Sequence, residues 1–229
     1  MSIKIGFVHE FDFDSQIVRN FFEKNWERKI ALPDKSFYEW QFINPPENYS
    51  KDHCVVAYNI EKKEILGAIG INKRTFFLNN KVLNGAEFTT WVTSKDTKNF
   101  GLGANVGIKI LLFLQAKFDV LIGMGSTEIA TPLYMRSGFR LIKAIPRFVK
   151  VINFDNIKKF SIFNNLSIKL INKWKSKENE KYLFEEVNDE RYKIIFDDIK
   201  KKYNLFSRSP EYRNWRYKQH PYYKYKEFL

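Results

Sequence analysis

Three strand-like segments follow one another in the N-terminal half of the chain, and this run limits the possible folds more than any other feature of the sequence. The segments, residues 53–60, 65–77 and 83–92, are rich in Val, Ile, Phe and Thr, which favour strands. Short polar turns at residues 61–64 and 79–81 separate them. Connections this short join neighbouring antiparallel strands, so the sequence predicts an antiparallel meander.

Helices and further strands are expected on both sides of this meander. In order, the other elements are a strand at residues 3–8, a helix that begins at Asp14 or Ser15, a helix at 104–118, a strand at 120–124, a helix at 131–137 and a strand at 139–142. The strand at 120–124 is wholly apolar, as in strands that are buried on both faces. The order β-α-βββ-α-β-α-β predicts an α+β fold in which helices flank a mixed, mostly antiparallel central sheet.

Two glycines, Gly101 and Gly103, stand between the last strand of the meander and the apolar helix. Glycine lets the backbone approach a ligand closely, and the amides at the start of a helix attract anions. Lys98 adds a positive charge to the same loop. A pyrophosphate would suit this place, although a tight turn alone would also explain the glycines.

A dinucleotide-binding fingerprint is another interpretation, because Gly101, Gly103 and Gly107 fit a Gly-x-Gly-x-x-x-Gly variant. That fold requires an apolar strand that runs directly into the first glycine, and an acidic residue at the end of the next strand. Residues 93–99 are polar, and the next strand ends in Gly-Met-Gly-Ser at residues 123–126. The sequence therefore disfavours a dinucleotide site.

Two motifs decide the interpretation of the glycine loop. Residues 101–104, Gly-Leu-Gly-Ala, resemble the glycine part of the Q/R-x-x-G-x-G/A loop with which N-acetyltransferases of the GNAT family wrap the pyrophosphate of CoA. Residues 130–139 resemble the family's A-x-x-L-Y-x-x-x-G-F segment. The resemblance covers residues 3–151 and is most specific over residues 91–142.

The resemblance implies acetyl-CoA, or another acyl-CoA, as co-substrate, bound by the loop and by the backbone of the strand before it. The residues expected to contact it are Trp91, Val92, Lys98, Gly101, Leu102, Gly103, Ala104 and Thr127. Two of them depart from the family's pattern, since Lys98 replaces Arg or Gln and Thr127 replaces a common asparagine. Lysine keeps the charge of arginine but lacks its planar fork, so we expect an altered grip on the pyrophosphate.

The resemblance also implies a catalytic step in which an amine, or sometimes a hydroxyl, attacks the thioester carbonyl. Tyr134 matches the family's general-acid tyrosine, which serves the departing thiolate; the alternative is a packing role. We expect the base at Glu87, the only acidic residue within residues 83–92. Strand alternation puts Glu87 on the same face as Thr89 and Trp91, and a solvent-facing position is the alternative.

The second part of the chain, residues 152–229, is expected to form a helical extension of the acyl-CoA-binding domain at residues 1–151. Within this extension, residues 190–203 predict an amphipathic helix. Its apolar stripe consists of Tyr192, Ile195, Ile199 and Tyr203.

An aromatic motif occurs twice in the chain. Residues 37–42 read Phe-x-x-Trp-x-Phe, residues 212–217 read Tyr-x-x-Trp-x-Tyr, and a proline follows each copy closely. One interpretation is coincidence in a chain rich in Tyr and Trp; the other is a second, truncated GNAT-like domain that begins near residue 190. The motif faintly resembles tandem GNAT-like proteins of bacterial surface-polysaccharide clusters, which implies an amino-sugar or a related glycan precursor as the small-molecule acceptor.

Composition narrows the remaining classes. The single cysteine, Cys54, cannot form an internal disulfide and lies in an apolar run that suggests a buried thiol, while three scattered histidines argue against a metal site. The formal net charge is +13, but acidic residues interleave with the basic ones, so we expect no nucleic-acid partner. Without a signal sequence or a membrane span, we expect a cytoplasmic enzyme, either monomeric or homodimeric. The main rival is a non-catalytic GNAT-like module that binds CoA or a protein partner.

Overall fold

The computed structural model describes residues 2–97, 102–142 and 188–225. Apart from residues 141 and 142, these belong to one compact unit. Its sheet has the order β1-β2-β3-β4-β5, and a short sixth strand pairs with β3. The strands are β1 (Ile3–Phe7), β2 (Val55–Asn59), β3 (Glu64–Leu78), β4 (Lys81–Thr93), β5 (Val120–Gly123) and β6 (Leu205–Phe206).

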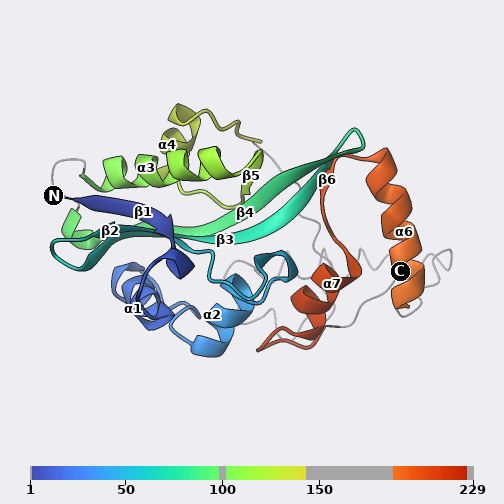
Figure 1. Ribbon diagram of the computed structural model, residues 1–229, viewed down its shortest axis with the longest axis horizontal. Coiled ribbons are helices and arrows are strands. Elements are labelled where there is room, and N and C mark those ends of the chain that lie inside the picture. The colour runs from blue at the N-terminus through green and yellow to red at the C-terminus, as the bar shows by residue number, and fades with distance from the viewer. Residues whose placement is uncertain (1, 98–101, 143–187, 226–229) are drawn as a thin grey trace, which may run out of the picture. The chain divides into compact units, whose positions relative to one another are not determined.

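Strands β2, β3 and β4 are antiparallel neighbours, so the predicted meander is confirmed. Strand β1 adds an antiparallel partner to β2, whereas β5 runs parallel to β4. The β3–β4 hairpin is long and extends past β1 and β2, and β6 pairs near its far end (Figure 1).

Helices cover both faces of the sheet. They are α1 (Ser15–Asn25), α2 (Lys35–Phe42), α3 (Leu102–Lys117), α4 (Ala130–Arg136), α6 (Asp189–Lys202) and α7 (Pro210–Arg213). Helices α1 and α2 lie on one side, here called the α2 face, and α3 and α4 lie on the other, the α3 face (Figure 1). The mixed, mostly antiparallel sheet flanked by helices confirms the predicted fold class.

Side-chain alternation along the strands divides the hydrophobic core into two parts. The part on the α3 face consists of Phe7, Val55, Ala57, Leu66, Ile69, Ile71, Ala86, Phe88, Val106, Ile110, Leu114 and Phe118. The part on the α2 face consists of Val8, Val18, Phe21, Phe22, Leu32, Tyr38, Phe42, Cys54, Val56, Ile65 and Ala68. The sheet is therefore buried on both faces in its central strands.

The structure has two helices between β1 and β2, where the sequence predicts one. The carboxylate of Asp14 accepts a hydrogen bond from the backbone N–H of Gln16 (2.6 Å) and caps α1 as expected. Asp34 caps α2 in the same way by accepting from the N–H of Phe37 (2.9 Å). An aromatic segment as short as α2 shows too little periodicity to distinguish a helix from a strand, so the cap at Asp34 is the signal that was missed.

Three other local predictions are wrong. Residues 139–142 form no strand, and the residues of β5 are half-buried or exposed rather than buried on both faces. On α6, the buried residue is Phe196, whereas Ile199 and Tyr203 of the predicted stripe are exposed. The reason is tertiary: α6 meets the hairpin through the rings of Phe196 and Phe77, whose centroids are 6.2 Å apart.

The two copies of the aromatic motif pack directly against each other. The Trp40 and Trp215 rings stack with centroids 5.2 Å apart, and both side chains are buried. Each indole N–H donates to the backbone carbonyl of the other tryptophan, at 3.0 Å from Trp40 and 2.6 Å from Trp215. We call this reciprocal contact the tryptophan clasp.

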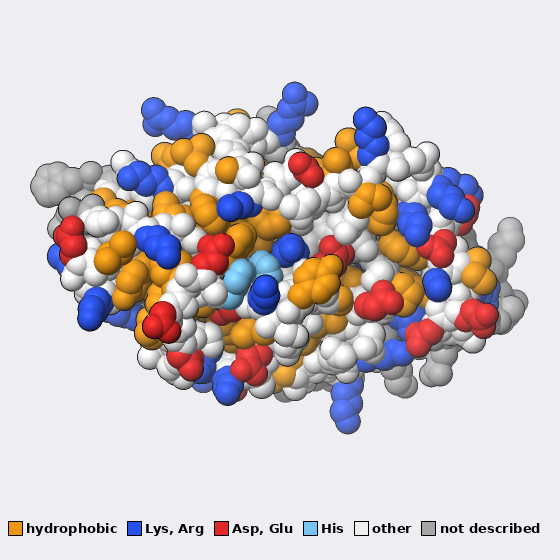
Figure 2. All heavy atoms as spheres, viewed as in Figure 1, with side chains coloured by type: hydrophobic (Ala, Val, Ile, Leu, Met, Phe, Trp, Pro, Cys, Tyr) orange, Lys and Arg blue, Asp and Glu red, His pale blue; other side chains and the backbone are white. Residues whose placement is uncertain are grey.

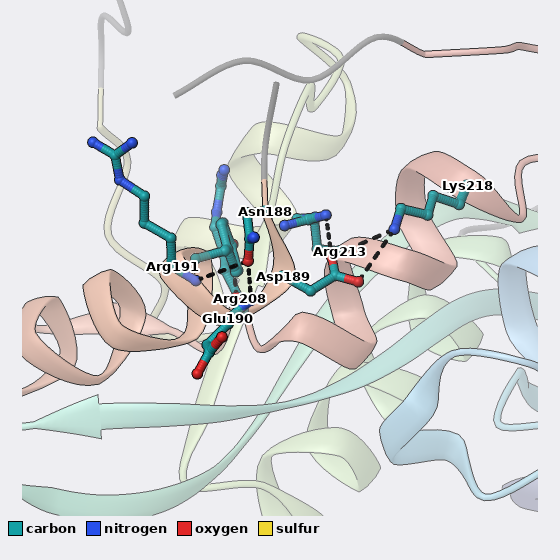
Figure 3. Close-up of polar contacts among 8 residues, drawn as sticks. Asn188, Asp189, Glu190, Arg191, Arg208, Arg213 and Lys218 are labelled. Atoms are coloured by element: carbon teal, nitrogen blue, oxygen red, sulfur yellow. Dashed lines mark hydrogen bonds and ion pairs between the residues drawn. The ribbon is translucent and has the colours of Figure 1, made fainter. Parts of the chain in front are cut away.

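Polar contacts hold the segment around the clasp together. Asn188 caps α6 by accepting from the N–H groups of Glu190 and Arg191 (Figure 3). The next residue, Asp189, forms ion pairs with Arg213 of α7 and with Lys218 (Figure 3). These contacts tie the start of α6 to the turn that carries Trp215.

Charges of both signs are interspersed on the surface. On the face seen in Figure 2, Lys and Arg side chains alternate with Asp and Glu rather than forming one basic patch. Histidine side chains lie near the centre of that face (Figure 2). Within the described residues, no helix combines the length and apolar character that a membrane span requires.

Candidate functional site

Strand β4 separates from β5 partway along its length. The parallel pairing begins at Gly85 with Val120 and ends at Phe88 with Gly123, yet β4 continues to Thr93. Among the described strands, none pairs with residues 89–93 of β4 on this side. The backbone N–H and C=O groups along this open edge can therefore bind an extended ligand, as a strand edge binds a peptide.

A β-bulge lies at the start of the open edge. In the β3–β4 register, Gly70 pairs with Thr89 but Ala68 pairs with Val92, so β4 carries one extra residue. Thr90 has φ of +53°, a left-handed conformation that is rare for a β-branched residue. Such strain persists only where the surroundings enforce it, and it concentrates at functional sites.

The bulge corrects one prediction about β4. The sequence predicts Glu87 and Trp91 on the same face, but the extra residue reverses the alternation between them. Trp91 packs on the α3 face, where it contacts Tyr134, whereas Glu87 points to the α2 face and pairs with Arg74. No glycine marks position 90, which explains why the sequence did not reveal the bulge.

On the α3 face, the open edge is lined by aromatic side chains. The ring of Tyr134, on α4, lies 5.4 Å from that of Phe88 and 4.9 Å from that of Trp91. Gly107 of α3 faces Trp91 so closely that a Cβ atom there would overlap the indole. The Nε1–H of Trp91 is buried and has no hydrogen-bond partner among the described residues. A buried donor without a partner is costly, which makes it available to a bound acceptor group.

Tyr134 lies at the point where β4 leaves β5, against Phe88 and Trp91. Burial raises the pKa of its phenol above the usual value, so the hydroxyl stays protonated at neutral pH. No hydrogen bond joins that hydroxyl to another described residue. Tyr134 can thus donate a hydrogen bond or a proton but cannot serve as a base.

The predicted pyrophosphate loop is described only in part. Lys98 and Gly101 lie outside the described residues, whereas Leu102, Gly103 and Ala104 form the first turn of α3. Thr127 lies before α4, where its hydroxyl accepts from the N–H of Ala130 (3.2 Å). This contact gives Thr127 a local role at the start of the helix.

On the α2 face, Glu87 forms an ion pair with Arg74 of β3, with Nη1 2.8 Å from Oε2. The exposed fraction is 19% for the Glu87 side chain and 9% for that of Arg74. The Arg74 guanidinium lies 4.3 Å from the ring of Tyr212, on α7. Sequence reasoning missed Arg74 and Tyr212. A signal existed for Arg74, because a single arginine within an apolar strand requires a partner.

Comparison with known proteins finds no matching family model and no significant match among curated sequences. The structural likeness is to acetyltransferases. One is glucosamine-6-phosphate N-acetyltransferase from Arabidopsis thaliana, at 16% identity over 67% of this chain and 100% of that chain, with a TM-score of 0.42. Another is a GNAT family acetyltransferase from Brucella melitensis in complex with acetyl-CoA, at 14% identity over 61% and 84%, with a TM-score of 0.41. Identities and TM-scores this low assign neither a family nor a substrate.

Proposed function

We propose that this chain transfers an acyl group from acyl-CoA to an amine. The observation that carries the proposal is the open edge of β4, which begins at the strained Thr90 and offers backbone groups beside Trp91 and Val92 that no described strand pairs on this side. An extended pantetheine arm has amides that can pair with such an edge. The glycine motif at residues 101–104 follows this edge in the chain, and its resemblance to the GNAT pyrophosphate loop supports the same ligand.

The residues around the open edge fit this co-substrate. A ligand carbonyl can accept from the indole N–H of Trp91, which has no partner among the described residues. Gly107 leaves the space that the indole occupies, so Trp91 keeps its position at the edge. Two features of the α3 face therefore favour the bound ligand before any chemistry begins.

Catalysis would use side chains from both faces of β4. Acyl-CoA supplies an activated thioester whose carbonyl carbon accepts the amine. Tyr134, protonated because burial raises its pKa, donates a hydrogen bond or a proton toward the departing sulfur from the α3 face. Glu87 takes the proton of the attacking amine from the α2 face.

The proposed acceptor is an amino-sugar or a related glycan precursor. Its support is the resemblance of the aromatic motif to tandem GNAT-like proteins of surface-polysaccharide clusters. Trp40 and Trp215 do not themselves stack on a sugar, since each is buried against the other in the tryptophan clasp. We also propose that a second GNAT-like segment begins near residue 190.

One observation favours the alternative of a non-catalytic module. One carboxylate oxygen of Glu87 is already held by Arg74, and a base occupied in this way can be idle. The two functions differ in turnover but not in binding, because an idle base leaves the open edge intact.

Isothermal titration with acetyl-CoA, with NADPH as the control, tests the proposal. We expect micromolar binding of acetyl-CoA and none of NADPH. An acetylation assay with glucosamine then distinguishes an enzyme from a binding module. Its readout is the free thiol of the CoA that the reaction releases. A protein that does not bind acetyl-CoA would contradict the proposed function altogether.

A further inference from the structure

Arg74 is held from outside the sheet by the segment that follows α6. Its Nη2 donates to the backbone carbonyl of Ser207 (3.0 Å), and its guanidinium lies 4.3 Å from the Tyr212 ring and 5.4 Å from the Phe206 ring. Ser207 is itself buried, and its N–H donates to the carbonyl of Thr75 (2.7 Å). The guanidinium is therefore fixed between β3 and residues 206–212.

The tryptophan clasp anchors this segment. Trp215 lies three residues after Tyr212, and the two rings are 5.2 Å apart. Residues 206–215 are therefore attached at one end to β3, through the pairing of Phe206 with Phe76, and at the other end to α2, through the two hydrogen bonds between Trp215 and Trp40. A segment attached in this way can hold Arg74 in one geometry.

Arg74 has only one ionic partner among the described residues, and that partner is Glu87. In the β3–β4 register Glu87 lies opposite Asn72, and Arg74 reaches it from the next position on the same face. The ion pair uses Oε2 of Glu87, and no described residue forms a hydrogen bond or an ion pair with Oε1. A carboxylate base must present one oxygen to its substrate in a fixed direction. A guanidinium that holds the other oxygen fixes that direction.

Burial of the Arg74–Glu87 ion pair has a desolvation cost that a purely structural role does not explain. Two charges taken out of water gain little net stability from each other, so such a pair is weak evidence of a stabilising role. The Nε–H of Arg74 is also buried without a partner among the described residues, which adds to the cost. A pair of this kind next to the open edge of β4 is better explained by the site it adjoins.

We propose that Arg74 is a positioning residue that directs Glu87 toward the acceptor amine, and that residues 205–212 are thereby part of the transferase site. The inference rests on the proposed function, since it assigns a role to the base of that reaction. The catalytic unit then includes the segment after α6, because the backbone carbonyl of Ser207 and the ring of Tyr212 hold the guanidinium.

A double-mutant cycle with Arg74→Gln and Glu87→Gln tests the inference, with glucosamine and acetyl-CoA as substrates. We expect each single variant to lower kcat/KM by about 100-fold, and the double variant to be no worse than Glu87→Gln alone. We also expect the loss to fall on kcat rather than on KM, because a misdirected base slows the chemical step and leaves substrate binding intact. The affinity for acetyl-CoA should change by less than about twofold, since neither residue lies on the α3 face.

Three outcomes separate the possibilities. If Arg74→Gln lowers kcat/KM by the same factor with and without Glu87, Arg74 does not act through Glu87 and the inference is overturned. If Arg74→Gln fails to fold, Arg74→Lys takes its place in the cycle, and partial rescue of kcat/KM is the expected result; full wild-type activity overturns the inference. A wild-type protein that fails to acetylate glucosamine contradicts the proposed function itself, a result distinct from both.

Discussion

The two faces of β4 differ in chemistry although they belong to one strand. The α3 face presents rings, with Phe88 and Trp91 against Tyr134, and no charged side chain takes part in that cluster. The α2 face presents the buried ion pair of Glu87 and Arg74. Ordinary alternation separates Glu87 from Phe88, and the extra residue at the bulge adds Trp91 to the face opposite Glu87. The proposed base therefore lies on one face of the strand, while the proposed acid, Tyr134 of α4, packs against the other.

Replacement of Tyr134 by Phe should give the largest effect on the α3 face. We expect kcat to fall by about 100-fold or more, because a donor to the leaving group contributes that much in general acid catalysis. The free energy of unfolding and the Kd for acetyl-CoA should stay unchanged, since the hydroxyl has no partner among the described residues. Tyr203→Phe, at an exposed position, is the matched control in the same assay. An unchanged kcat would remove Tyr134 from the mechanism.

Two glycine substitutions compare the faces directly. Gly107→Ala places a Cβ against Trp91 on the α3 face, and Gly70→Ala places one against Phe42 on the α2 face. Overpacking of this kind costs about 1–3 kcal/mol of stability in either case. We expect only Gly107→Ala to weaken acetyl-CoA binding, by about tenfold, because it displaces the indole at the open edge. Equal losses of affinity in both variants, measured by titration calorimetry, would show that the faces are not independent.

Acidification should affect the two faces in opposite directions. Tyr38 of α2 donates to Asp52 (2.8 Å), and His53 packs its ring 5.3 Å from that of Phe7 on the α3 face. Burial raises the pKa of Asp52 from 3.8 to about 6. As pH falls, the Asp52 carboxylate is therefore protonated in the folded state before it is protonated in the unfolded chain. The contribution of Asp52 to stability rises as pH falls from about 6 to about 4. Burial lowers the pKa of His53 from 6.5 to about 4, so the unfolded chain takes up that proton first and stability falls over the same range.

Urea unfolding at pH 4, 5, 6 and 7 tests these opposing slopes. Relative to wild type, Asp52→Asn should lose roughly 1–3 kcal/mol on acidification, and His53→Asn should gain stability. Taking differences from wild type removes the contribution of the other titrating groups. If the stability of both variants changed in the same direction with pH, the predicted opposite contributions of Asp52 and His53 would be disproved.

The smallest expected effect is that of Trp91→Phe. The substitution removes an N–H that is buried without a partner among the described residues, so stability should change by less than about 1 kcal/mol. If the N–H binds a carbonyl of acyl-CoA, the Kd for acetyl-CoA should rise by up to about tenfold. An unchanged Kd would mean that the indole donates to another group.

Local patterns in the sequence predict much of the fold but little of the site's geometry. The meander, the cap at Asp14 and the helix after Gly103 follow from strand composition, capping and glycine placement, which act within a few residues. The bulge is different: Thr90 is a good strand residue, and only packing forces it into the left-handed region.

Pairs distant in the sequence explain the other omissions. Arg74 is the single arginine of β3 and Glu87 the single acid of β4, and the hairpin pairing of Leu78 with Lys81 would have placed them within reach. The role of Tyr212 depends on the tryptophan clasp, and a motif that occurs twice does not say that its copies touch. The Arg74–Glu87 pair follows from strand register and the role of Tyr212 from tertiary contacts, and amino-acid composition reveals neither.

The tryptophan clasp has a consequence for folding during synthesis on the ribosome. Its partners are 175 positions apart, so during synthesis at roughly 5–20 residues per second Trp40 leaves the ribosome on the order of ten to thirty seconds before Trp215 exists. During that interval the indole of Trp40 lacks the ring of Trp215 that buries it in the folded protein. The ion pair of Arg74 and Glu87 likewise lacks its contacts with residues 206–212. Exposed apolar surface of this kind promotes aggregation and attracts chaperones. The half of the chain made first therefore depends, for its own protection, on the half made last.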